Sequence, residues 1–273
     1  MEGDLADLKN EKKEETIENW GEIKWTEKFG KDAMLVAGAI LLASLIIAGS
    51  VVAVSQKLAP KIPTTAKDAA QTAPNAPGKE DVSATTSLDD DSVLGDKKKA
   101  KAAIVEFSDY ECPYCKRFHQ ETFDQLVKDY VDTGKVALAF RDFPLSFHDP
   151  NATMEAGVAE CVRKEKGDKA YFSFGKALYE GTQANGKGLP AGKLDELIRK
   201  TGANPTTVNA CAETTAVKQE IAKDIEDGGK AGISGTPSFI IGALNTDGTV
   251  TGERIVGAVP INNFKETIDK YLK

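Results

Sequence analysis

The distribution of apolar and polar residues divides the 273-residue chain into four parts. Residues 1–32 are polar and densely charged, and we expect a cytoplasmic N-terminal segment there. Residues 33–55 contain no charged residue. As a helix this stretch would span roughly 34 Å, against about 30 Å for the hydrocarbon core of a bilayer. The pattern therefore predicts a single transmembrane helix over residues 33–55.

A cleaved signal peptide is the alternative interpretation of this apolar stretch. It is disfavoured because a long acidic region precedes the stretch, and because the stretch is longer than a typical signal core. Three lysines flank each side, so the charge distribution does not set the orientation. We place the N-terminus in the cytoplasm because of the cysteine content discussed below. This predicts a single-pass protein of the cell membrane whose C-terminal domain is extracytoplasmic.

Residues 56–93 are rich in Ala, Pro, Thr, Ser and Asp. Such a composition cannot bury enough apolar surface to fold, so it predicts a flexible linker. Coil statistics give a linker of this length a root-mean-square span of about 35 Å. The linker would hold the folded part, predicted at residues 94–273, away from the membrane while keeping it tethered.

From residue 94 onward, strand and helix patterns alternate. Apolar runs at 102–107 and 136–140 predict strands on either side of a helix at 116–131. A hairpin of strands 238–241 and 254–256 turns at Asn245–Gly248, and a helix at 261–272 follows. Between these two parts, breaks at Gly and Asn separate five predicted helices, at 153–164, 169–179, 191–200, 204–212 and 217–231. The order predicts an α/β layer fold with a helical insertion at about 150–230.

The sequence Cys112-Pro113-Tyr114-Cys115 lies where the first strand meets the first helix. A Cys-x-x-Cys pair in this position is typical of a redox dithiol. Unpaired N–H groups and the helix dipole should lower the pKa of the first thiol, and Pro113 suits the first helical position. We expect Cys112 to be the nucleophile and Cys115 to be the more buried resolving thiol.

A zinc half-site is the alternative interpretation of the same pair. Zinc would need two further ligands, and the chain has only two histidines, His119 and His148. No second paired motif completes a site. We therefore favour redox chemistry and expect neither a metal nor another cofactor.

The remaining cysteines are Cys161 and Cys211. An even count beside a redox pair suggests a second, structural disulfide in an oxidising compartment, which would stabilise the fold by about 4 kcal/mol. Two buried, reduced cysteines remain the alternative. The net charge of −7 and the lack of a large basic run argue against nucleic acid as a partner.

Two further positions carry candidate chemistry. Thr236-Pro237 precedes an apolar strand, where a cis proline without an N–H would leave a backbone edge open to a peptide. The local sequence by itself favours an ordinary trans proline at this position. Glu106 lies within the first apolar strand, so burial should raise its pKa and suit it to pass protons to and from Cys115. The alternative is a Glu at the strand end that reaches solvent. Asp109 and Glu111 would oppose a thiolate and receive no role, and Lys116 and Arg117 are expected to face water.

Three segments resemble the DsbA-like thiol:disulfide oxidoreductases of the thioredoxin superfamily: Val105–Cys115, Arg141–Leu145 and Gly232–Phe239. The resemblance covers residues 94–273 and implies a thioredoxin fold interrupted by a helical domain. It also implies a cis Pro237, with Thr236 as the variable neighbour that tunes the site. Cys161 and Cys211 fall where many membrane-anchored relatives carry a second disulfide, and an acidic residue such as Glu106 recurs beneath the dithiol.

The resemblance implies a membrane-tethered oxidase that introduces disulfides into secreted or surface proteins. Its substrates would be reduced or unfolded extracytoplasmic proteins, and a quinone-linked membrane partner would reoxidise it. Tyr114 stands where the family often has histidine, so a milder potential and the direction of electron flow stay open. The alternatives are a reductase or isomerase of the same fold, or a non-catalytic, membrane-anchored chaperone-like module.

Overall fold

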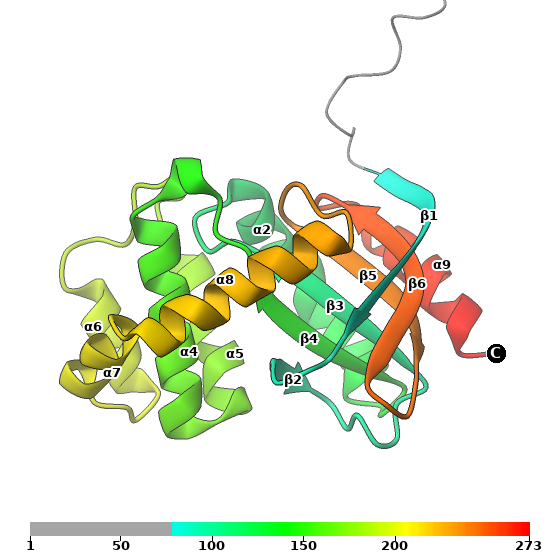
Figure 1. Cartoon of the computed structure of the whole chain (residues 1–273), viewed down its shortest axis with the longest axis horizontal. Coiled ribbons are helices and arrows are strands. Elements are labelled where there is room, and N and C mark those ends of the chain that lie inside the picture. The colour runs from blue at the N-terminus through cyan, green and yellow to red at the C-terminus, as the bar shows by residue number, and fades with distance from the viewer. Residues whose placement is uncertain (1–77) are drawn as a thin grey trace, which may run out of the picture. The chain divides into compact units, whose positions relative to one another are not determined.

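The structure is a computed structural model that describes residues 78–273. A six-stranded sheet has the order β1-β6-β5-β3-β4-β2 (Figure 1). Strands β3 and β4 are parallel, whereas all other neighbouring strands are antiparallel. The strands are β1 Gly78–Ser87, β2 Ser92–Leu94, β3 Ala102–Ser108, β4 Val136–Asp142, β5 Ser238–Leu244 and β6 Thr249–Val256.

Helices connect and cover these strands. A continuous helical segment from 113 to 131 joins β3 to β4 and contains two π-helical turns; its parts are α2 Pro113–Phe118, η2 His119–Phe123, α3 Asp124–Leu126 and η3 Val127–Val131. The remaining helices are η4 Ser146–His148, α4 Asn151–Lys166, α5 Asp168–Gly181, α6 Lys193–Lys200, α7 Pro205–Ala212, α8 Thr215–Lys230 and α9 Ile261–Tyr271. Helices α4–α8 form the predicted insertion. The strands and helices predicted from residue 94 onward are present with small changes of their ends, except that β6 begins at Thr249 and not at the predicted residue 254.

The predicted linker is wrong from residue 78 onward, because β1 and β2 lie within it. Strand β1 pairs with β6 along nearly its whole length, from Gly78 opposite Val256 to Ser87 opposite Thr249. Strand β2 pairs with β4 at the other edge of the sheet. The remainder of the linker and the predicted membrane helix at 33–55 lie outside the described residues. Within residues 78–273, no helix has the length and apolar character needed to cross a bilayer.

Each face of the sheet contributes to a separate apolar cluster. On one face, Ile104 and Phe239 pack with Phe118 of α2 and Phe264 of α9, and this cluster continues into the helical insertion. On the other face, Val105, Phe107 and Ile240 pack with Phe143 and Ile233. Helix α8 crosses in front of β4 (Figure 1), and its Gly228 leaves space there for the Phe143 ring. The two faces alternate along β3 because successive strand residues point to opposite sides.

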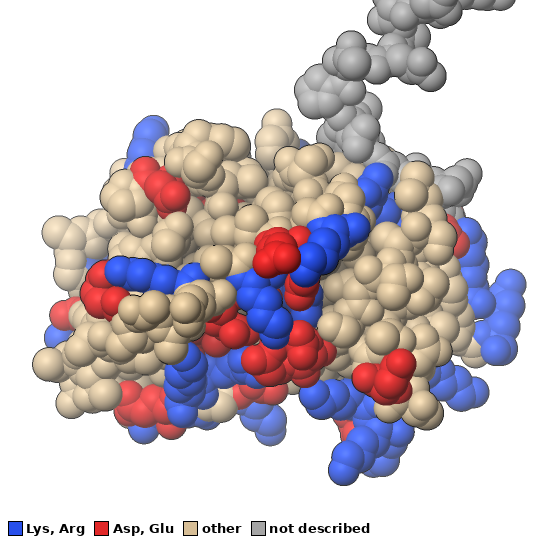
Figure 2. Space-filling model, in the orientation of Figure 1, with Lys and Arg blue, Asp and Glu red and all other residues tan. Residues whose placement is uncertain are grey.

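Charged side chains of both signs alternate along α8. Ion pairs join Lys218 to Glu213 at 2.9 Å, Lys223 to Asp90 at 2.7 Å and Lys230 to Glu226 at 2.9 Å. Figure 2 shows this mixture on the face over which α8 runs, with mostly uncharged side chains toward the end of the domain at which α2 begins.

Candidate active site

The Cys112–Cys115 pair lies at the start of α2, directly beyond the end of β3. Cys112 is the residue that precedes the helix, with an extended backbone at φ −77° and ψ 122°, and Pro113 is the first helical residue. The carbonyl oxygen of Cys112 accepts a hydrogen bond from the N–H of Lys116 at 3.0 Å, which closes the first turn. Both thiols are reduced, and the side chain of Cys115 is the more deeply buried, as predicted.

The two thiols differ strongly in acidity. A hydrogen bond from the Cys115 thiol, helped by the backbone N–H groups of Tyr114 and Cys115, lowers the pKa of Cys112 from 9.0 to about 6 against the opposing effect of burial. Complete burial, together with the facing Cys112, raises the pKa of Cys115 well above 9.0. At neutral pH Cys112 is therefore mostly a thiolate and Cys115 a thiol. The helix N-terminus contributes as expected, but the resolving cysteine is the largest single cause.

The Thr236-Pro237 peptide bond faces the dithiol and is cis, as the family resemblance implied. In its protonated form, the Cys112 thiol donates a hydrogen bond to the Thr236 carbonyl oxygen at 3.4 Å. Pro237 precedes β5, and its carbonyl oxygen accepts the N–H of Gly257 at 2.7 Å, which ties this segment to the end of β6. Thr236 lies 124 positions after Cys112 in the sequence. The bond to Gly257 therefore holds a distant segment of the chain beside Cys112.

Glu106 is completely buried within β3 and pairs with His119. His119 Nε2 and Glu106 Oε1 are 2.9 Å apart, while Glu106 Oε2 has no hydrogen-bond partner among the described residues. The alternative of a Glu that reaches solvent is thus wrong. The sequence did carry a signal for the partner, since a carboxyl in an apolar strand needs one, and His119 lies 13 residues away in the adjoining helix.

His119 lies between aromatic rings in the core. Its ring stacks on Tyr179 of α5, with centroids 4.1 Å apart, and on Phe123 of the same π-helical turn, with centroids 4.5 Å apart. The Tyr179 hydroxyl in turn shares a 2.9 Å hydrogen bond with the Ser108 hydroxyl at the end of β3. Sequence reasoning missed Tyr179 and Ser108, because contacts between α5 and β3 span 71 residues.

Asp109 and Glu111, to which the sequence assigned no role, are buried and hold the turn before Cys112 together. Asp109 Oδ1 accepts the N–H of Glu111 at 2.7 Å, and its Oδ2 accepts the N–H of Leu145 at 2.8 Å and lies 2.8 Å from His148 Nδ1. Burial raises the pKa of Asp109, while these hydrogen bonds oppose the rise. The earlier assignment is therefore wrong, since both residues are structural anchors of the active-site turn.

Glu111 fastens a second segment, residues 182–188, beside the dithiol. Its Oε1 accepts a hydrogen bond from the Thr182 hydroxyl, and its Oε2 accepts the N–H of Gly188 at 2.8 Å. The backbone carbonyl of Glu111 accepts the N–H of Asn185 at 2.7 Å. Lys116 adds a 2.6 Å hydrogen bond from its ammonium group to the Thr182 carbonyl. Lys116 is thus partly buried and held by this segment, contrary to the expectation that it faces water.

The residues around the mouth of the site are exposed and aromatic or basic. Tyr114 is 54% exposed, and the Arg117 guanidinium lies over its ring at 5.2 Å. Arg117 also donates to the Ala258 carbonyl oxygen at 3.1 Å, and it is exposed, as predicted. A cation over an exposed ring holds that ring in place at modest energetic gain. The mouth therefore presents an oriented aromatic surface.

A separate group of carboxylates is the candidate for holding a metal within residues 78–273. Oxygen atoms of Asp91, Glu220 and Asp224 lie within 4.8 Å of one another. Arg141 already donates to Asp91 at 2.6 Å, and burial together with the Asp91 charge raises the pKa of Asp224 to about 9. Protonation and Arg141 therefore neutralise part of this group, which lies on elements other than those that carry the dithiol.

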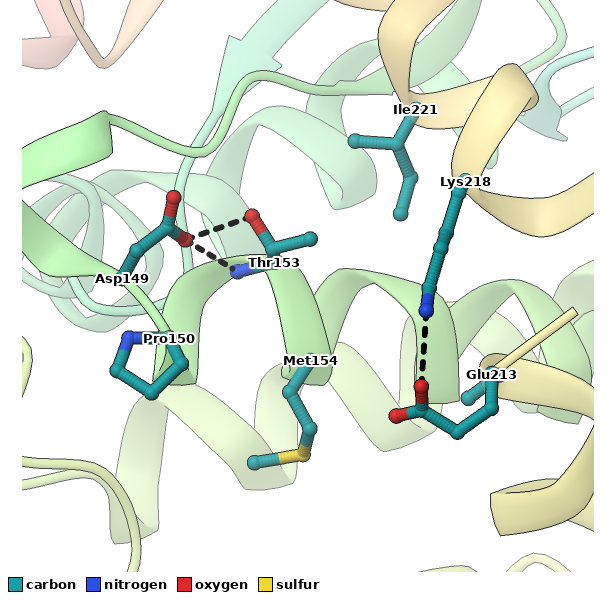
Figure 3. A pocket seen from close by; sticks show the side chains of 8 residues that line it. Asp149, Pro150, Thr153, Met154, Glu213, Lys218 and Ile221 are labelled. Carbon is teal, nitrogen blue, oxygen red and sulfur yellow. Dashed lines mark hydrogen bonds and ion pairs between the residues drawn. The ribbon is translucent and has the colours of Figure 1, made fainter. Parts of the chain in front are cut away.

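A pocket of about 350 Å³ opens where α4 begins, next to α8 (Figure 3). The polar side chains in its wall already bond to each other: Asp149 accepts from the hydroxyl of Thr153 at 2.6 Å, and Lys218 pairs with Glu213 at 2.9 Å. Neither cysteine of the dithiol lines this pocket. The pocket is therefore separate from the dithiol.

Cys161 of α4 and Cys211 of α7 form a disulfide. The bond joins two helices of the insertion whose residues are 50 positions apart. Cys161 is buried in the larger apolar cluster, and Cys211 packs against the same cluster. The bond therefore cross-links α4 and α7 within the insertion.

The fold and the dithiol together define a thioredoxin-fold redox protein. A family model described as thioredoxin matches residues 87–260. Disulfide bond formation protein D of Bacillus subtilis (strain 168) is 29% identical over 198 residues, which cover 72% of this chain and 83% of that protein. Among solved structures, oxidised BdbD from Bacillus subtilis is similar with a TM-score of 0.58 at 27% identity, over 70% of this chain and 97% of that one. Pseudomonas aeruginosa DsbA2 gives a TM-score of 0.55 at 30% identity, over 66% and 92% of the two chains.

The chain belongs to this thioredoxin family, in its DsbA-like branch of disulfide oxidoreductases. It is accordingly a thiol:disulfide oxidoreductase, as the resemblance of its motifs implied. The predicted α/β thioredoxin fold with a helical insertion is confirmed.

Proposed function

We propose that this protein is a membrane-tethered disulfide oxidase that works outside the cytoplasm. The observation that carries the proposal is the opposite displacement of the two thiol pKa values, with Cys112 lowered to about 6 and Cys115 raised well above 9.0. Only the reduced dithiol gains from an ionised Cys112, because the disulfide does not titrate. A stabilised reduced form makes the oxidised form a better oxidant.

The size of this effect follows from the Cys112 pKa. Relative to a thiol of pKa near 9, a pKa of about 6 stabilises the reduced dithiol by about 1.4 kcal/mol at pH 7, or about 30 mV for a two-electron couple. This stabilisation of the reduced dithiol vanishes below pH 6 and grows to about 4 kcal/mol above pH 9. Structural disulfides of secreted proteins have potentials below about −300 mV, so a potential raised above the −270 mV of thioredoxin increases the driving force for their formation.

The reaction begins with the Cys112–Cys115 disulfide. A substrate thiolate attacks Cys112 Sγ, the Sγ–Sγ bond breaks, and Cys115 leaves as a thiolate that takes up a proton. A second substrate thiolate then attacks the substrate sulfur of the mixed disulfide, and Cys112 leaves as a thiolate. Two electrons pass from substrate to enzyme, and at neutral pH one of the two substrate protons is released to water. We assign Cys112 as the attacked sulfur and Cys115 as the resolving thiol.

Three neighbouring groups would assist these steps. Thr236 and Pro237 lie beside Cys112, and a proline without an N–H leaves a backbone edge on which an extended substrate can lie. Glu106 is buried beneath the helix, and one of its oxygens has no hydrogen-bond partner within residues 78–273, which suits it to exchange protons with the region of Cys115. Pro113 and Tyr114 form the turn between the thiols, and exposed Tyr114 offers an apolar contact to an unfolded chain.

The membrane part of the proposal is supported by residues 33–55, which are long and apolar enough to span a bilayer. The Cys161–Cys211 disulfide supports an oxidising compartment, since such bonds are rare in the cytosol. A dithiol reduced by each turnover needs an electron acceptor, which for a membrane-bound oxidase would be a quinone-linked membrane protein. The substrates would be reduced or unfolded extracytoplasmic proteins.

A trapping experiment tests the proposed chemistry. In the full-length chain, Cys115→Ser removes the resolving thiol. When its Cys112 thiolate attacks a disulfide of a disulfide-bonded protein, one substrate sulfur leaves as a thiolate, and the mixed disulfide at Cys112 should accumulate on non-reducing gels. Cys112→Ser is the matched control and should form no adduct. If the oxidised wild type fails to oxidise a reduced, unfolded protein and Cys115→Ser traps nothing, the dithiol is not an exchange centre.

A labelling experiment tests the proposed location. A membrane-impermeant maleimide added to intact cells should modify the reduced Cys112 thiol when the domain lies outside. Modification that requires permeabilised cells would place the domain in the cytoplasm and overturn this part of the proposal.

A further inference from the structure

A buried carboxyl group on α4 has no hydrogen-bond partner among the described residues. Glu155 is 0% exposed, and neither of its carboxyl oxygens bonds to another described group. Burial, together with the negative charge of Glu111, raises the pKa of Glu155 to about 9. The side chain is therefore a neutral acid at physiological pH, with one proton to donate.

The groups that face Glu155 belong to the turn before the nucleophile. Glu111 and Asp109 are the acidic neighbours that raise its pKa, and Asp109 is itself paired with His148 of η4 at 2.8 Å. Glu111 directly precedes Cys112. A neutral Glu155 leaves this turn with two acidic side chains and one histidine, whereas an ionised Glu155 would add a third buried negative charge.

Glu111 is also the anchor of residues 182–188, which need that anchor. Ala184 and Asn185 have φ angles of 58° and 56°, a region that side chains other than glycine occupy only when neighbouring contacts impose it. The contacts that impose it here are the hydrogen bonds of Thr182, Asn185 and Gly188 to Glu111. The Glu111 carboxylate thus supplies two of the hydrogen bonds that keep this segment against the active-site turn, beside those from Lys116 to Thr182 and from Asn151 to Gly186.

We propose that Glu155 is a positioning residue for the dithiol: its neutral acid group donates a hydrogen bond to the Glu111 carboxylate and holds it in the place from which it fastens residues 182–188. The inference rests on the proposed function for its consequence on disulfide exchange. When Glu155 loses its proton, two carboxylates oppose each other without water, the Glu111 side chain is displaced, and residues 182–188 detach from the turn before Cys112.

The variants that test the inference are Glu155→Gln, Glu155→Leu and Glu160→Gln in the full-length chain. Glutamine keeps a donor but cannot ionise. Leucine removes the donor. Glu160 is a second buried acid on α4 that pairs with Arg163 at 3.5 Å and serves as the matched control.

Trypsin cleavage after exposed Lys187 measures detachment of residues 182–188 without use of the dithiol. Variants are compared at the same pH, so the pH dependence of trypsin cancels. At pH 7 the wild type and Glu155→Gln should be cleaved equally slowly. Above pH 9 the wild type and Glu160→Gln should be cleaved up to about tenfold faster for each pH unit, because the open form has released one proton, whereas Glu155→Gln should stay protected. Glu155→Leu should be cleaved faster already at pH 7.

The rate of disulfide exchange with oxidised glutathione gives the second measurement. The ratio of the Glu155→Gln rate to the wild-type rate should be close to one at pH 7 and should rise above pH 9. Equal cleavage and equal exchange rates for these two proteins at every pH would overturn the inference. If Glu155→Leu does not fold, the comparison between the wild type and Glu155→Gln still tests the inference. Wild-type protein with the expected cleavage pattern but no exchange at pH 7 would overturn the proposed function instead.

Discussion

The ionisation of Cys112 depends most on the hydrogen bond from Cys115, and replacing Cys115 tests this dependence. A hydrogen bond to a charged group contributes about 1.5–3 kcal/mol. Each pKa unit corresponds to about 1.4 kcal/mol, so Cys115→Ala should raise the Cys112 pKa by about one to two units, from about 6 to about 7–8. The thiolate fraction at pH 7 should then fall from about 90% to about 10–50%.

Cys115→Ser is the matched control, because its hydroxyl still donates a hydrogen bond from the same position. The Cys112 pKa in this variant should stay within about half a unit of the wild-type value, since the donor is kept. The assay is the rate of alkylation by iodoacetamide between pH 4 and pH 9. In both variants Cys112 is the one free thiol of the chain, because Cys161 and Cys211 are bonded to each other.

The competing explanation is that the N-terminus of α2 alone ionises Cys112. In that case the backbone N–H groups of Tyr114 and Cys115 would suffice, and both variants would keep a pKa near 6. An unchanged pKa in Cys115→Ala would therefore refute the assignment of Cys115 as the main cause. A rise of equal size in both variants would also refute it, since serine keeps the donor.

Three further sets of variants test the disulfide of the insertion, the packing of α8 and the role of Glu106. Alanine at both Cys161 and Cys211 should lower the free energy of unfolding by about 4 kcal/mol, because the bond closes a loop of 50 residues; an unchanged melting temperature under oxidising conditions would contradict this. Gly228→Ala should destabilise by about 1–3 kcal/mol, because its Cβ would lie 2.6 Å from Phe143. The neighbouring Gly229→Ala, with nothing within 4 Å, should stabilise by up to about 1 kcal/mol, and urea unfolding that gave the reverse order would exclude the packing argument. Glu106→Gln should slow formation of the mixed disulfide between substrate and the oxidised protein by about 100-fold, because Cys115 must take up a proton in that step; single-turnover formation at the wild-type rate would remove Glu106 as the proton carrier.

The elements that the sequence predicted correctly are those whose apolar pattern is local. Strand β3 is buried at every position, so its apolar run from Ala102 is continuous in the sequence. Strand β1 was missed because its only large apolar residue is Val82, which is 49% exposed. Its place in the sheet comes from pairing with β6, as in the contact between Thr85 and Thr251, 166 residues apart. A local sequence pattern does not identify a pairing strand that lies so far along the chain.

The residues of the site likewise divide into those that a local motif identifies and those whose contacts are distant in the sequence. The dithiol and the proline beside it were found because short motifs carry them. The buried polar contacts of Glu111 were missed, because Thr182 and Gly188 lie 71 and 77 residues away. From the sequence, a carboxylate next to a thiolate looks unfavourable. The structure shows that its charge is directed away, into hydrogen bonds with residues 182–188.

The most direct test of the account is the reduction potential of the Cys112–Cys115 couple in glutathione buffers as a function of pH. The potential should fall by about 59 mV per pH unit below pH 6, where both thiols carry protons, and by about 30 mV per pH unit between pH 6 and pH 9, where only Cys115 does. At pH 7 the potential should lie between about −250 and −120 mV. A constant slope of about −59 mV up to pH 9, with a potential at or below about −270 mV, would contradict the claim that an ionised Cys112 makes this protein an oxidant.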